Sequence, residues 1–123
     1  MNTQINPYPS KKLPKGFKYP VLYLELISSN KIDIYPWWLI DSKTKAGELF
    51  YKVSQLNGKN LIPFAKIDID DDVACFDGND NSGNPSIIMN CSTPDRSYCF
   101  KDFSQWFEQV QKDIVKYHID RKA

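Results

Sequence analysis

The stretch from Asn60 to Asn90 constrains the fold most, because three short apolar runs alternate there with two polar breaks. The runs are rich in β-branched and aromatic residues, which favours strands over helix. The breaks are rich in Asp, Asn and Gly, as turns are. The pattern therefore predicts an antiparallel meander with strands at 61–67, 73–76 and 87–89.

The middle run, Val73-Ala74-Cys75-Phe76, is apolar at every position. A strand that faced water on one side would alternate apolar with polar residues, so this strand is expected to be covered on both faces and to lie centrally in its sheet. With helical patterns on either side of it, the chain is predicted to be an α+β domain, an antiparallel β-sheet flanked by helices.

The first covering helix is predicted at 42–57. Its apolar residues fall on one stripe, and Gly58 follows in the usual C-terminal position. That stripe is expected to cover one face of the meander and consists of Ala46, Leu49, Phe50, Val53 and Leu56.

The second covering helix is predicted at 102–119, with Asp102 as N-cap and Gln105 as its capping-box partner. We expect its apolar face to pack on the sheet beside Val73 and Cys75. That face consists of Phe103, Trp106, Phe107, Val110, Ile114 and Tyr117.

The N-terminal part is less regular. Residues 1–12 are polar and contain two prolines, which predicts a flexible arm that contributes little, followed by a single domain over 13–123. Pro20 begins a stretch that predicts a short, mostly buried helix ending near 28–30. A strand is the alternative, because residues 22, 24 and 26 also alternate with 23 and 25.

Two adjacent tryptophans follow the bend expected at Pro36. Neighbouring residues of an extended chain point to opposite sides, so one of Trp37 and Trp38 is expected in the core and the other at the surface, where it could contact a partner. The alternative is that both fill the core. We include Trp38 among the candidate partner-binding residues.

Charge is the feature that most needs a functional explanation. Residues 67–95 hold seven aspartates (68, 70, 71, 72, 77, 80 and 95) and no Lys or Arg. One interpretation is that Asp keeps turns and hairpin tips in water; the other is an acidic surface for a basic partner. On the second interpretation the partner-binding residues are Asp68, Asp70, Asp71, Asp72 and Asp77. Within that set, Asp70 and Asp71 are expected to speed association, and Asp72 and Asp77 to cap turns.

Motifs for catalysis or cofactors do not emerge from the sequence. Asp68, Asp70 and Asp72 match the start of an EF-hand loop, but Val73 stands where its glycine is needed and Asn79 where its glutamate is needed. His118 is the single histidine, and phosphate-loop and zinc spacings are absent. We therefore expect no enzyme activity, no cofactor and no metal.

Composition limits the class of binding partner and the cellular compartment that we expect for this chain. A net charge of +1 does not favour nucleic-acid binding, and no apolar stretch approaches the roughly 18 residues that span a bilayer. The three cysteines are odd in number and lack metal spacing. The expectation is a reduced, cytoplasmic protein whose partner is another protein.

Taken in order, the motifs resemble the SUKH superfamily, the Smi and Knr type proteins. Bacterial members commonly carry an L-[IV]-P-F-A segment, an acidic D-D-V-A-C-[FW]-D segment and a closing F-x-x-[FW]-x-x-W-[FL] helix. Here these are 61–65, 71–77 and 100–107. The segments YPWWLID at 35–41, Leu13-Pro14 and 17–20 extend the resemblance over roughly 13–110.

The resemblance implies an α+β domain with an antiparallel sheet flanked by helices. It also implies a role, because many bacterial relatives are thought to be immunity proteins that bind and neutralise a cognate toxin, often a nuclease. A regulatory or scaffolding role without a toxin is the alternative that it leaves open. The loop from Asp77 to Pro85 is longer than is usual in the family.

Overall fold

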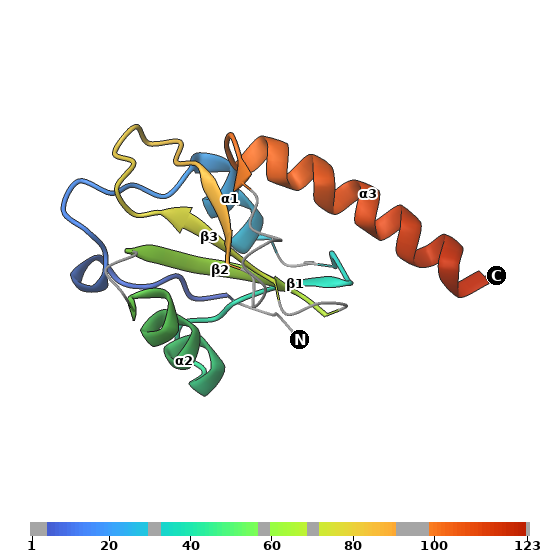
Figure 1. Cartoon of the computed structure of the whole chain (residues 1–123), viewed down its shortest axis with the longest axis horizontal. Helices are drawn as coiled ribbons and strands as arrows, with labels where there is room; N and C mark the ends of the chain where they lie inside the picture. Colours follow the sequence, from blue (N-terminus) through green and yellow to red (C-terminus); the bar gives the residue numbers. More distant parts are fainter. Residues whose placement is uncertain (1–4, 30–32, 57–59, 69–71, 91–98, 123) are drawn as a thin grey trace.

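The computed structural model describes residues 5–29, 33–56, 60–68, 72–90 and 99–122, and these form a five-stranded antiparallel sheet with helices on both faces (Figure 1). The sheet is a meander in the order β1-β2-β3-β4-β5. The strands are β1 (Trp37–Leu39), β2 (Leu61–Ile67), β3 (Val73–Asp77), β4 (Ile87–Asn90) and β5 (Cys99–Phe100). The helices are α1 (Val21–Ile27), α2 (Lys45–Ser54) and α3 (Phe103–Lys122), with a 3-10 turn at Ser10–Lys12. The predicted α+β meander is confirmed.

Strand β3 is the middle strand and is covered on both faces, as its sequence predicts. Ala74 and Phe76 belong to one buried cluster with residues of α1 and α3. Val73 and Cys75 belong to a second cluster, against which Phe50 of α2 packs. Figure 1 shows the same division, with α2 on one side of the sheet and α1 and α3 on the other.

The face under α1 and α3 is filled with aromatic rings. A shift in the pairing register of β2 and β3 falls between Pro63 and Ala65, and Phe64 within it stacks on Phe76 with ring centroids 4.1 Å apart. Trp106 of α3 packs edge-on against Phe64 at 4.8 Å. Helix α3 therefore lies over Ala74 and Phe76, and the prediction that it lies beside Val73 and Cys75 is wrong. Alternation separates the two faces of a strand but does not say which helix covers which face.

Helix α2 covers the other face with a different stripe from the one predicted. Leu49 is 61% exposed, and Val53 and Leu56 are exposed as well. The inward side carries Gly47, Phe50, Tyr51 and Ser54 instead. The Oγ of Ser54 lies 4.0 Å from the Sγ of buried Cys75. Hydrophobicity misidentified the stripe because small residues occupy two of the inward positions. Gly47 packs against the backbone of Asp41 in the turn before the helix, and Ser54 lies against Cys75 of the sheet.

The described part of the N-terminal arm is built into the fold. Tyr8 is buried in the core, and its hydroxyl donates to the backbone oxygen of Gly47 in α2. The Asn6 carbonyl accepts a hydrogen bond from the Ser42 N–H at 2.8 Å. The prediction that this arm contributes little is therefore wrong for residues 5–12.

Helices α1 and α3 begin where their sequences indicate. Pro20 precedes α1 as N-cap, so the strand alternative is wrong, but Val21, Leu22 and Leu24 are exposed and Tyr23 is buried. Asp102 Oδ1 accepts from the Gln105 N–H at 3.0 Å. The Gln105 side chain in turn accepts from the Lys101 N–H at 2.6 Å. In a capping box it would accept from the N–H of the N-cap residue, Asp102, which is one residue further on.

Trp106→Ala is expected to lower the free energy of unfolding by about 3–5 kcal/mol, because it empties a fully buried aromatic site. Denaturant titration measures the change. Val115→Ala, at an exposed position of the same helix, should cost less than about 0.5 kcal/mol. A loss below about 1 kcal/mol for Trp106→Ala would contradict the packing described above.

Gly47→Ala tests the close contact of α2 with the backbone of the turn that precedes it. In an exposed helix this change stabilises by up to about 1 kcal/mol. Here the new Cβ would collide with the backbone oxygen of Asp41, so we expect a lower melting temperature. Ala46→Gly, at the exposed neighbouring position, should destabilise only by the ordinary propensity difference. A stabilising Gly47→Ala would show that the helix does not contact this backbone.

Candidate functional site

The two tryptophans of β1 point to opposite faces of the sheet. Trp37 is buried under α3, and its indole N–H donates to Asp113 Oδ2 at 2.7 Å. Trp38 is half-buried beside Phe50 of α2, and its indole N–H donates to Asp68 Oδ1 at 2.9 Å. One tryptophan in the core and one reaching the surface is the arrangement that the sequence predicts.

Asp68 and Trp38, both predicted partner-binding residues, form one cluster together with two tyrosines. The ring of exposed Tyr35 lies 4.9 Å from that of Tyr117, near the end of α3. Hydrogen bonding to Tyr117 and then to Asp68 raises the pKa of the Tyr35 hydroxyl. We call Tyr35, Trp38, Asp68 and Tyr117 the aromatic–acidic cluster. It brings together β1 and the segment before it, the residue after β2, and α3.

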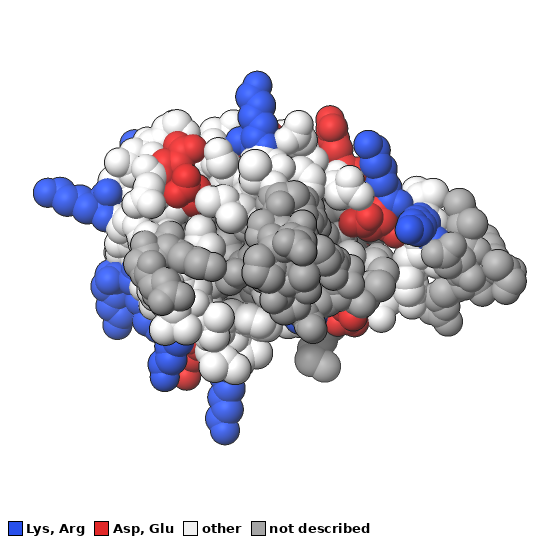
Figure 2. Space-filling view, in the orientation of Figure 1, with Lys and Arg blue, Asp and Glu red and all other residues white. Residues whose placement is uncertain are grey.

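The described members of the predicted acidic surface, Asp68, Asp72 and Asp77, do not form a single patch. Asp72 is only 2% exposed, so it cannot present its charge to a partner, and its assignment as a partner-binding residue is wrong. Asp77 pairs with Leu61 at the opposite end of β3, roughly 17 Å from Asp72 along the strand. On the face shown in Figure 2 the acidic side chains are likewise separated. Asp70 and Asp71 lie outside the described residues.

Asp77, the last residue of β3, and Asp80 hold together the loop that follows this strand. Asp77 Oδ1 accepts from the Asn79 N–H at 2.9 Å, which is the turn-capping role predicted for it. Asp80 Oδ1 accepts from the Ser82 N–H at 3.0 Å and Oδ2 from the Ser86 N–H at 3.2 Å. These carboxylates therefore satisfy backbone donors of their own loop.

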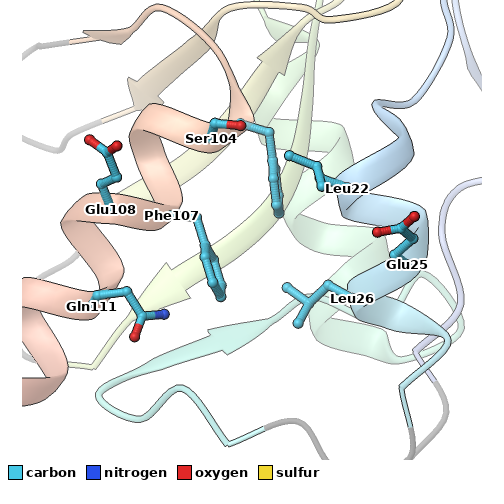
Figure 3. A pocket seen from close by; sticks show the side chains of 8 residues that line it. Leu22, Glu25, Leu26, Ser104, Phe107, Glu108 and Gln111 are labelled. Atoms are coloured by element: carbon cyan, nitrogen blue, oxygen red, sulfur yellow. The ribbon is translucent and has the colours of Figure 1, made fainter.

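A groove that the sequence did not predict lies between α1 and α3. It has a volume of about 510 Å³ and is lined by Leu22, Leu26, Phe103, Phe107, Ser104, Gln111, Glu25 and Glu108. Figure 3 shows Leu22, Leu26 and Phe107 pointing into the space between the two helices. The apolar residues of α1 were expected to be buried, so the sequence gave no sign of an open apolar surface here.

The described residues contain no group of three His, Cys, Asp or Glu side chains placed to hold a metal ion. Within the same residues, none of the helices is both long enough and apolar enough to cross a bilayer. Of the described cysteines, Cys75 is buried and Cys99 is exposed.

Comparison with known proteins gives no match to a family model, to a curated protein or to a solved structure. The resemblance to the SUKH superfamily therefore depends on the order and spacing of the motifs in this sequence. The function that it implies is treated below as a proposal.

Asp80→Asn tests the capping of the loop through its pH dependence. The Ser82 hydroxyl, then the Ser82 and Ser86 backbone N–H groups, lower the pKa of Asp80 below the ordinary value of about 3.9. Its stabilisation is complete above that ordinary value and is lost as the pH falls through the folded-state pKa. Asp80→Asn should therefore lower the melting temperature at pH 7, and the difference should shrink in acid. A difference independent of pH would contradict a role for the charge, and Glu108→Gln, exposed on α3, is the control.

Proposed function

We propose that this chain is a non-enzymatic protein-binding domain of the cytoplasm, of the immunity type, which binds and neutralises a cognate toxin. The aromatic–acidic cluster is the observation that carries the proposal. The motif order that resembles the SUKH superfamily supplies the expectation of a toxin as partner. What the cluster itself supports is recognition of a protein surface.

The residue types of the cluster are those that contribute most to protein interfaces. Tyrosine and tryptophan bury large rigid surfaces while keeping a polar tip, and they are enriched among the residues that dominate binding energy. The indole of Trp38 is hydrogen-bonded to Asp68 and the ring of Tyr35 packs on Tyr117, so both rings are held by a neighbour before a partner arrives. Such preorganisation reduces the entropy lost on binding.

The charge of Asp68 favours a basic partner surface. Asp68 is exposed at the end of β2, where its field reaches solvent. A rim carboxylate acts mainly on the rate of encounter and on its salt dependence. Among the described residues, the acidic part of the proposed binding surface is therefore Asp68, which lies beside the aromatic residues of the cluster.

The first experiment is to test the product of the adjacent gene as a partner. A toxin gene directly beside the gene for this chain, whose product binds the purified chain and loses activity on binding, would support the proposal. If relatives of this chain consistently lack such a neighbour, the regulatory or scaffolding alternative gains support instead.

Asp68→Asn is expected to slow association with that toxin by about two- to tenfold at low salt and to flatten the salt dependence. Stopped-flow fluorescence measures both effects. Glu48→Gln, which removes an exposed carboxylate of α2 outside the cluster, should leave the rate unchanged. Equal rates for wild type and Asp68→Asn would exclude Asp68 from the binding surface.

A further inference from the structure

The groove between α1 and α3 continues along α3 into a second hollow. The first hollow is lined from α3 by Phe103, Phe107 and Gln111 among others. Gln111 also lines the second hollow, of about 480 Å³, together with Lys112, Val115 and Lys116. Positions 104, 107, 108, 111 and 115 lie on one face of a helix. The two hollows therefore form one track along α3.

The length of this track suits a helix. From 104 to 115 the axis of α3 rises about 16 Å, which is roughly three helical turns. Figure 1 shows the C-terminal end of α3 extending beyond the sheet. Leu22 beside the first hollow is 50% exposed and Val115 beside the second is 57% exposed. Apolar side chains are thus available to a partner at both ends.

Charge differs between the two ends of the track. Glu25 and Glu108 flank the first hollow, and in Figure 3 they stand on either side of the apolar side chains. Lys112 and Lys116 flank the second hollow. A small apolar ligand would fill one hollow and leave this charge pattern unused. A peptide that spans both hollows could pair with both ends.

We propose that this track binds an amphipathic α-helix of a partner protein. Apolar side chains of that helix fill the groove between α1 and α3 and contact Leu22, Phe107 and Val115. Its basic residues face Glu25 and Glu108, and its acidic residues face Lys112 and Lys116. This surface is distinct from the aromatic–acidic cluster, and the inference does not depend on the partner being a toxin.

The test is a selection of displayed peptides of about 15 residues, long enough to cover the track as a helix, against the full wild-type chain. Affinities of the enriched peptides are measured by fluorescence anisotropy with purified variants. We expect Leu22→Arg to weaken binding by about tenfold or more, because it places a cation at the apolar centre of the interface. The matched control is Leu49→Arg, the same change at an exposed leucine of α2 on the other side of the sheet, which should have no effect.

The charge pattern is tested with Glu108→Lys. This variant should weaken the enriched peptides severalfold at low salt, and exchange of their basic residues for glutamate should restore binding. The proposal is overturned if no peptide is enriched, if Leu22→Arg leaves affinity unchanged, or if Leu49→Arg weakens binding as much as Leu22→Arg does. Sedimentation that shows a dimer dissolved by Leu22→Arg would also overturn it, because the groove would then be filled by a second copy of this chain.

Discussion

Most of the architecture depends on the central strand β3, which cannot leave either face in water. Its residues from Val73 to Phe76 are apolar and buried, and each exposed face would forfeit about 25 cal/mol for every Å² of apolar surface. Both layers of helix follow from this requirement. Helix α2 covers Val73 and Cys75, and α1 with α3 covers Ala74 and Phe76.

The two faces are packed by different means, and this difference produces the groove. On the α2 side a single helix packs on the sheet through Phe50 and Ser54. On the other side two helices contact each other over a broad aromatic layer. Two helices that pack side by side on one face of a sheet leave a groove between them on the solvent side, unless long side chains fill it. Here Leu22 and Phe107 line the groove, and the acidic residues Glu25 and Glu108 flank it. The groove therefore stays open and apolar.

The acidic residues show how an antiparallel meander distributes neighbouring turns. Successive turns of a meander lie at opposite ends of the sheet, so charges that are close in sequence are carried apart. Asp68 and Asp72 lie at one end of β3, and Asp77 and Asp80 at the other. Repulsion among them is reduced by this separation. Asp77 and Asp80 accept hydrogen bonds from backbone N–H groups of their own loop. Asp68 is exposed and accepts a hydrogen bond from Trp38.

The sequence alone determined the three strands β2, β3 and β4 of the meander, the central position of β3, the start of α3 at Asp102 and the opposite directions of Trp37 and Trp38. These features depend on local alternation, capping and turn chemistry, which act over a few residues. Only the tertiary structure decided which helix covers which face, which stripe of α2 is buried, that Asp72 is buried and that Tyr8 enters the core. Each of these depends on close contacts between segments far apart in the chain, such as Ser54 of α2 with Cys75 of β3 and Tyr8 with Gly47 of α2. A local pattern of hydrophobicity carries no information about such contacts, so the buried stripe of α2 and the groove beside α3 could be found only in the folded chain.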